Sequence, residues 1–307
     1  KAGGVYFSHS QFLKVIMQFP ELKYDFEYSA ADLGGGISVA YYDSGETAGR
    51  ETLLMIHGLS SYIPAWMKLI PLLKENFRCI AIDLPGYAKS SSGVHSGSMA
   101  FYADVISSLI RKLNLTGVSL VGHSMGGQVA MTAALKYPSL IERLVLLAPA
   151  GFEVFTENEK GRLLKNNTPQ YYASASDNQI EYNFSINFFK MTGDADGMIK
   201  DRKMMRGWKN FNDYCTVVAN SFRSLLEEPV AGRLADIKQK TLIIYGLNDK
   251  FIPQPVLHRD MKGEDFARDA AAKFPDASLL LLDECGHFLQ FEKEKEIADA
   301  ILRFYGV

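Results

Sequence analysis

Residues 118–136 read VSLVGHSMGGQVAMTAALK, and this stretch decides the fold. Its opening VSLV is a short apolar run, which is typical of a strand buried on both faces. From residue 128 onward the apolar residues have the spacing of a helix. The six residues between the strand and the helix, GHSMGG at 122–127, are rich in glycine and long enough only for a sharp turn. A strand that turns directly into a helix is the repeating step of an α/β fold with a parallel sheet.

The same step recurs along the rest of the chain. Further apolar runs stand at 52–58, 78–86, 143–151, 241–249 and 278–287. Stretches with helical spacing alternate with them at 65–76, 98–115, 128–138, 265–274 and 294–305. This alternation predicts a mostly parallel central sheet flanked by helices. Two extended stretches, 24–33 and 37–45, are separated by three glycines and predict a hairpin ahead of that sheet.

The alternation of strands and helices breaks after residue 151 and resumes near residue 233. The stretch between is rich in aromatic residues and methionine. We therefore expect residues 1–151 and 233–307 to form an α/β core and residues 152–232 to form an inserted helical cap. Because the insertion leaves the core on the side where parallel strands end, it is a candidate lid over a site.

Composition narrows the class of protein and its partners. The 307 residues suit one large core with one insertion, and 47% hydrophobic residues are typical of a globular chain. With 33 Lys and Arg against 35 Asp and Glu, the formal charge of −2 excludes an electrostatic preference for nucleic acid. Neither a C-x-x-C pair nor a Cys/His cluster is present, so we expect no metal site.

Localisation stays open. The sequence has no apolar run long enough to span a membrane and no recognisable signal peptide. It begins at Lys1, so the chain is either cytoplasmic, or periplasmic or membrane-associated after removal of a signal or anchor. Residues 12–19, FLKVIMQF, predict a helix packed on the body, with peripheral contact to a membrane or lipid interface as the alternative.

The turn at Ser124 has the context that a serine nucleophile needs. A serine between a strand and a helix is held in strained backbone geometry above the sheet, and the helix directs its free N–H groups toward any anion formed beside it. We expect Gly122 and Gly126 to be required because side chains there would collide with the neighbouring strand and helix.

A serine hydroxyl needs a general base, and His287 is the best candidate. It follows the last apolar run directly, so in a parallel sheet it reaches the same edge as Ser124. The other histidines are interpreted as structural or solvated, with His123 facing away from the chemistry; they are His9, His57, His95, His123 and His258.

The base also needs a carboxylate to orient it. Asp249 fits best because it follows the apolar run at 241–246, one strand before His287. Three rivals remain, namely Glu153 after the run at 143–151, and Asp283 and Glu284 close to the base.

An oxyanion formed during acyl transfer needs fixed N–H donors. The residue after the nucleophile, Met125, and Leu59 in the loop after the run at 52–58 are the candidates. Gly58 lets that loop turn tightly, and we expect His57 to brace it.

In their order along the chain, HGLSS (57–61), DLPGYAKS (83–90), GHSMGG (122–127), GLNDKFIP (246–253) and CGHFLQFE (285–292) resemble the α/β-hydrolase superfamily. LLAPAGFE (146–153) and the expected cap are similar to bacterial esterases and lipases of the monoacylglycerol lipase-like branch. The resemblance implies Ser124 as nucleophile, His287 as base and Asp249 as acid, Leu59 and Met125 as oxyanion donors, and no cofactor or metal. Dehalogenases and epoxide hydrolases of this fold carry aspartate at the position of Ser124, so the serine argues against both classes of enzyme.

These observations predict a serine hydrolase that cleaves carboxylic esters through an acyl-enzyme. The aromatic and methionine-rich cap favours apolar, short- to medium-chain acyl esters or monoacylglycerols.

One alternative is a carbon–carbon bond hydrolase of ring-fission (meta-cleavage) products. Such enzymes usually have Gly-Pro-Gly after the oxyanion histidine and tryptophan after the catalytic histidine, where this chain has Leu59-Ser60-Ser61 and Phe288. Another alternative is a noncatalytic binding protein on the same fold. Both a monomer and a homodimer remain open.

Overall fold

The computed structural model describes residues 17–45 and 50–307. Within them an eight-stranded sheet has the order β1-β2-β4-β3-β5-β6-β7-β8. β1 and β2 pair antiparallel with each other, and β2 pairs antiparallel with β4, whereas β3 to β8 all run parallel. The strands are β1 (Ser29–Gly34), β2 (Ile37–Asp43), β3 (Thr52–Ile56), β4 (Arg78–Ile82), β5 (Val118–His123), β6 (Arg143–Leu147), β7 (Lys240–Gly246) and β8 (Ala277–Leu282).

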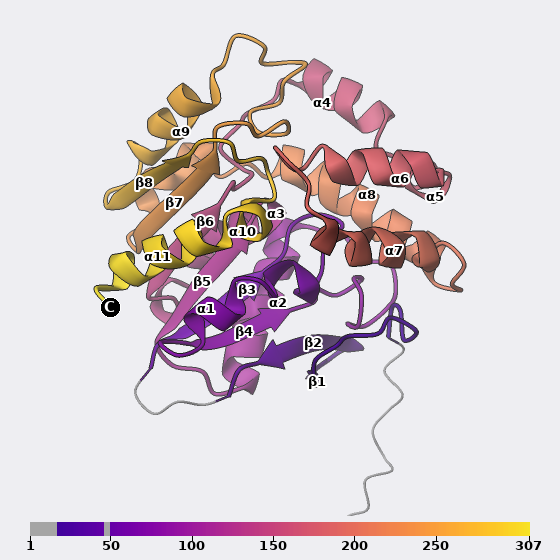
Figure 1. Cartoon of the computed structure of the whole chain (residues 1–307), viewed down its shortest axis with the longest axis horizontal. Coiled ribbons are helices and arrows are strands. Elements are labelled where there is room, and N and C mark those ends of the chain that lie inside the picture. The colour runs from indigo at the N-terminus through magenta and orange to yellow at the C-terminus, as the bar shows by residue number, and fades with distance from the viewer. Residues whose placement is uncertain (1–16, 46–49) are drawn as a thin grey trace, which may run out of the picture.

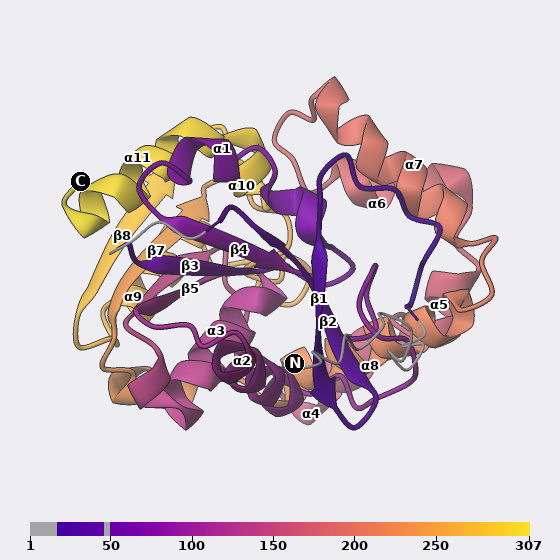
Figure 2. The ribbon, with the colours of Figure 1, turned by 90° about the horizontal axis from the view of Figure 1, so that it is seen from below.

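Helices cover both faces of this sheet, which explains why its central strands are continuous apolar runs. Every residue of β3 and β5 is buried. Figure 2 shows α1 (Ile70–Leu73) and α11 (Glu294–Tyr305) on one face, with α2 (Met99–Lys112), α3 (Met125–Lys136) and α9 (Gly263–Ala271) on the other. The predicted hairpin, the mostly parallel sheet and the flanking helices are confirmed.

One predicted helix is wrong. Residues 65–76 do not form a continuous helix; instead the chain makes a 3₁₀ turn, η1 (Ile63–Trp66), and then the four-residue helix α1. Pro64 and Pro71 stand in the first turn of each element. Proline has no N–H to donate to a preceding carbonyl, so Pro71 prevents one helix from running through this stretch.

The chain between β6 and β7 is helical, as the sequence predicts. Figure 1 shows these helices gathered along one side of the molecule. They are α4 (Glu157–Lys165), α5 (Pro169–Ala173), α6 (Asp177–Ser185), α7 (Asp196–Met205) and α8 (Phe211–Glu227), with the 3₁₀ turns η3 (Gly193–Ala195) and η4 (Ala231–Asp236). We call residues 152–232 the insertion. The remaining elements are η2 (Pro138–Leu140) and the short α10 (Leu289–Glu292).

The apolar segment at 12–19 is only partly visible. Residues 12–16, for which a packed or membrane-facing helix is predicted, lie outside the described residues. Met17 forms a β-bridge with Ser91. Phe19 is fully buried, with its ring centroid 5.3 Å from those of both Trp208 and Tyr214 in the insertion. Among the described residues, no helix is long and apolar enough to cross a membrane.

Candidate active site

Ser124 stands at the junction of β5 and α3 in strained backbone geometry. Its φ of 53° and ψ of −118° are unusual for a residue with a side chain. The surroundings hold this conformation, because the Ser124 N–H donates to the Leu147 carbonyl at 3.0 Å and its own carbonyl accepts from Gly127 and Ala150. The predicted sharp turn is therefore present, and it lifts the serine side chain to the carboxyl end of the sheet.

The glycines of this turn are required by close backbone contacts. A Cβ on Gly122 would lie 2.3 Å from the Gly126 carbonyl oxygen, and a Cβ on Gly126 would lie 2.0 Å from the Ile56 carbonyl oxygen. Gly127, which the sequence did not single out, would place a Cβ 2.7 Å from the side chain of Pro149. At Gly122 and Gly126 the turn thus packs main chain against main chain, and no side chain fits between.

Gly126→Ala is expected to destabilise the protein by about 3 kcal/mol, because β3 and α3 must separate to admit the methyl group. The matched control is Gly161→Ala in the middle of α4, where a Cβ would have no atom within 4 Å. That change should stabilise by about 0.5 to 1 kcal/mol through helix propensity. Urea unfolding of both variants measures the difference, and equal stabilities would contradict the close contact.

The structure brings the predicted nucleophile, base and acid together. His287 Nε2 lies 2.9 Å from the Ser124 Oγ, and His287 Nδ1 lies 2.7 Å from the Asp249 Oδ2. The side chains of His287 and Asp249 are only 7% and 2% exposed. The other carboxylate oxygen of Asp249 accepts from the backbone N–H groups of Phe251 at 2.7 Å and Ile252 at 3.1 Å. Since these two N–H groups fix the carboxylate, it presents one oxygen to the histidine.

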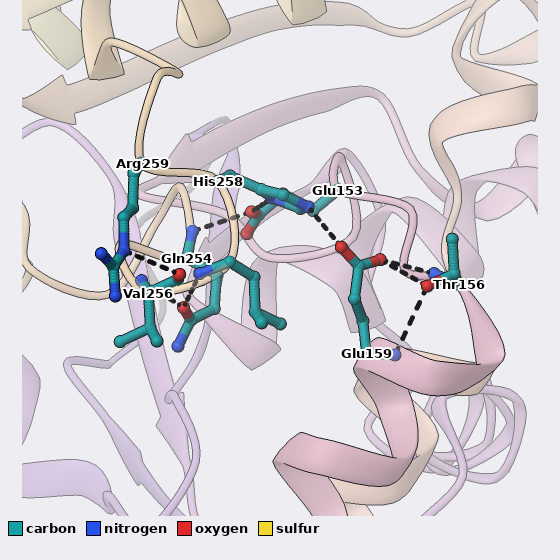
Figure 3. Close-up of polar contacts among 8 residues, drawn as sticks. Glu153, Thr156, Glu159, Gln254, Val256, His258 and Arg259 are labelled. Atoms are coloured by element: carbon teal, nitrogen blue, oxygen red, sulfur yellow. Dashed lines mark hydrogen bonds and ion pairs between the residues drawn. The ribbon is translucent and has the colours of Figure 1, made fainter.

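The rival carboxylates lie elsewhere. Figure 3 shows Glu153 facing His258, whose Nδ1 donates to the Glu153 carboxylate at 2.6 Å, while the Gln254 N–H donates to the same oxygen at 2.8 Å. Burial raises the pKa of the Glu153 carboxyl above its usual value, and the charge of Asp249 adds to this shift. Glu153 is therefore the partner of a second histidine and not of His287. Asp283 and Glu284 are exposed, whereas His287 is buried against Asp249.

The interpretation of His123 as facing away from the chemistry is wrong. Its Nε2 donates to the His287 backbone carbonyl at 2.8 Å, and the two imidazole rings are 4.9 Å apart. Burial lowers the pKa of His123 well below its usual value, so the ring is neutral. The sequence could not reveal this contact, because it depends on the loop of His287 passing over the end of β5. His123 therefore supports the backbone of the candidate base.

Two backbone donors lie beside Ser124. The N–H groups of Leu59 and Met125 have no hydrogen-bond partner within residues 17–45 and 50–307. A Cβ on Gly58 would lie 3.1 Å from the Ser124 Cβ, so the loop after β3 runs directly against the turn. His57 braces this loop, since its ring nitrogens bond the Gly58 carbonyl and the Leu84 N–H, and burial lowers the pKa of His57 to about 4.

Asp83 is a supporting residue to which the sequence reasoning gave no role. It is fully buried and accepts from Tyr24 Oη at 2.6 Å and from the backbone N–H groups of Ile63 at 2.8 Å and Lys89 at 3.0 Å. Burial raises the pKa of the Asp83 carboxyl to about 6. In the sequence, the position of Asp83 directly after an apolar run, within the DLPGYAKS stretch, could have indicated this supporting role. Asp83 joins the loops after β3 and β4.

A cavity of about 490 Å³ opens over Ser124 and His287. Most of its wall is aromatic or aliphatic and comes from the insertion and from the loop after β7, including Phe184, Met198, Met205, Phe211, Phe222 and Phe251. Its polar lining residues include Glu153, Asp201, which accepts from Tyr62 Oη at 2.6 Å, and Arg202. The Arg202 guanidinium donates to the Ser60 carbonyl at 2.7 Å and to the Tyr214 hydroxyl. Among the described residues, no carboxylate forms an ion pair with Arg202.

Known proteins share this architecture. Residues 51–294 match the family model described as alpha/beta hydrolase fold. The chain is 27% identical over 285 residues to 2-hydroxy-6-oxononadienedioate/2-hydroxy-6-oxononatrienedioate hydrolase of Escherichia coli (strain K12), covering 89% of this chain and 92% of that protein.

Solved structures agree on the fold. A probable hydrolytic enzyme from Pseudomonas aeruginosa PAO1 superposes with a TM-score of 0.81 at 24% identity, over 94% of this chain and 96% of that one. An esterase from Exiguobacterium antarcticum superposes with a TM-score of 0.73 at 19% identity, over 91% and 99%. The family model spans most of the chain and the eight-stranded sheet has the expected form, so this protein belongs to the α/β-hydrolase family.

Proposed function

We propose that this protein is a serine hydrolase that attacks a carbonyl carbon through Ser124. The observation that carries the proposal is the continuous hydrogen-bonded series from Ser124 through His287 to Asp249 at the base of a largely apolar cavity. A nucleophile, a base and an orienting acid within hydrogen-bond reach of one another form the set that acyl transfer requires.

The reaction has two steps. In the first, His287 Nε2 takes the Ser124 proton while Oγ attacks the carbonyl carbon, and the oxyanion accepts from the N–H groups of Leu59 and Met125. The histidinium then gives its proton to the leaving group, which leaves an acyl group on Ser124. In the second step water, activated by His287, attacks that acyl group and releases the acid. Asp249 accepts from Nδ1–H throughout and keeps the imidazole in place.

A carboxylic ester with an apolar portion is our first candidate substrate. A cavity of about 490 Å³ with aromatic and methionine walls suits an acyl chain or an apolar alcohol. The loop Leu59-Ser60-Ser61 and Phe288 after the base also favour esters over ring-fission products. We further propose that the insertion acts as a cap, because it supplies most of the wall opposite Ser124.

Carbon–carbon bond hydrolysis is the second candidate, and the curated relatives support it more directly than they support esters. The Escherichia coli relative is named for the hydrolysis of a hydroxy-oxo-dienedioate, which carries carboxylate groups. In this chain the Arg202 guanidinium faces the cavity without a carboxylate partner among the described residues, so it is available to an anionic substrate.

A substrate panel separates the two candidates. p-Nitrophenyl and glyceryl esters of increasing chain length are assayed beside a ring-fission dienoate, with Arg202→Gln as a second enzyme. An ester hydrolase should prefer acyl chains longer than acetate and keep its KM for neutral esters in the variant. A carbon–carbon hydrolase should turn over the dienoate at least about 100-fold faster than any ester, and its KM for the dienoate should rise about 10-fold or more in Arg202→Gln. An ester optimum at acetate would count against an apolar acyl site.

A further inference from the structure

The loop that carries His287 is held on its core side by two residues. Asn248 Oδ1 accepts from the Cys285 N–H at 3.3 Å, and the Asn248 N–H donates to the Cys285 carbonyl at 2.9 Å. His123 Nε2 donates to the carbonyl of His287 itself. These contacts leave the N–H groups of Gly286 and Phe288 as the backbone donors on either side of the base.

The Phe288 donor and the backbone of Gly286 both contact the insertion. The Phe288 N–H donates to the Asn187 carbonyl at 2.9 Å. A Cβ on Gly286 would lie 2.6 Å from both the Asn187 carbonyl oxygen and the Phe189 nitrogen. The loop of the base and residues 187–190 of the insertion are therefore packed main chain to main chain, although about 100 residues separate them in sequence.

A single carboxylate joins these two segments. Glu292, at the end of α10, accepts from the Gly286 N–H at 2.8 Å and from the Phe189 N–H at 3.2 Å through one oxygen. Its other oxygen accepts from the Lys190 N–H at 2.7 Å. One carboxylate therefore satisfies three backbone donors. Hydrogen bonds to a carboxylate are stronger than hydrogen bonds between two neutral groups.

We propose that Glu292 is a positioning residue that couples the place of residues 187–190 to the orientation of His287. The inference rests on the proposed function, because it assigns His287 as the base. A shift of residues 187–190 moves the Glu292 carboxylate, and the carboxylate in turn moves the Gly286 N–H. Because His287 is the next residue along the chain, its orientation changes as well. The edge of the insertion at 187–190 is thus tied to the loop of the base.

Glu292→Gln tests this coupling. Glutamine has the same shape but only one acceptor oxygen, so at least one of the three backbone N–H groups then faces an NH2 group and loses its acceptor. The matched control is Glu296→Gln on α11, whose side chain is 53% exposed and whose recorded partner is Lys293 at 3.9 Å. For Glu292→Gln we expect kcat for a small ester and the rate of fluorophosphonate labelling of Ser124 to fall about 10-fold to 100-fold, since small misplacements of a base have effects of that size. KM should stay within about twofold, because the small ester does not fill the cavity.

Hydrogen exchange supplies the independent measurement. In Glu292→Gln the peptides that contain 187–190 and 286–288 should both exchange faster, whereas Glu296→Gln should leave both unchanged. Glu292→Asp keeps the charge, and it replaces Glu292→Gln in all assays if circular dichroism shows that the latter is unfolded. A variant that unfolds at lower temperature but labels at the wild-type rate would show a merely structural role and overturn the inference.

The two proposals fail in different ways. Wild-type protein that does not label at Ser124 contradicts the proposed function, and with it the role of His287 as the base. Wild-type protein that labels, together with Glu292→Gln that labels equally fast, contradicts only the positioning role. Faster exchange in one of the two peptides but not the other would also overturn the coupling.

Discussion

Ser124→Ala is expected to lower kcat for the best substrate of the panel by about a million-fold, the size of effect seen when a serine nucleophile is removed. The change removes only Oγ. Alanine keeps the Cβ, so the strained backbone at φ 53° is no more strained than before and the fold should be retained. Turnover that remains would come from water attacking a carbonyl polarised by the N–H groups of Leu59 and Met125.

The control for this variant is Ser108→Ala, which alters an exposed serine on α2 and should leave turnover unchanged. Initial rates and mass spectrometry of a fluorophosphonate adduct check both variants. Substantial turnover in Ser124→Ala would remove the serine from the mechanism. Wild-type protein that neither turns over the panel nor forms the adduct would instead support a noncatalytic binding protein on this fold.

Asp249→Asn should lower kcat about ten thousand-fold, because it reverses the tautomer of the base. The Oδ1 of Asp249 accepts from the N–H groups of Phe251 and Ile252, so asparagine must keep its oxygen there. Its amide N–H then points at His287 Nδ1, which has to accept. The imidazole proton moves to Nε2, and Nε2 can no longer accept the proton of Ser124.

Glu153→Gln is the matched comparison for Asp249→Asn. Glu153 is also a buried carboxylate beside a histidine, but its partner is His258. We expect kcat to change no more than about threefold, since Glu153 bonds His258 and the Gln254 N–H and does not touch Ser124 or His287. Steady-state rates for both variants decide the matter. The reverse ranking, with Glu153→Gln the slower enzyme, would make Glu153 the functional acid.

The sequence predicts those parts of the molecule that depend on local pattern. Continuous apolar runs indicate buried parallel strands because helices cover both faces of the sheet. Since such strands end at one edge, the positions of Ser124, Asp249 and His287 directly after three of them predict that they meet. The one helix that failed, at 65–76, has suitable apolar spacing but contains Pro71, and spacing alone ignores the missing N–H.

The parts that the sequence could not supply depend on contacts between distant loops. His123 occupies a variable position in its motif, and only the path of the loop at 285–288 shows that it bonds the His287 carbonyl. Glu292 lies inside the recognised CGHFLQFE stretch, yet two of its three donors belong to the insertion. Arg202 is one of several basic residues on α7, and nothing in the local pattern distinguishes the one that faces the cavity.

The backbone contacts of the Ser124 turn set limits on how this enzyme can be altered. A side chain added at Gly122 or Gly126 meets carbonyl oxygens, and no second substitution can make a carbonyl smaller. A clash with a side chain, by contrast, can be relieved by trimming that side chain. Laboratory evolution of this protein should therefore leave the turn unchanged and gather its accepted substitutions in the flexible methionine and aromatic wall of the insertion, where losses and gains of volume can compensate one another.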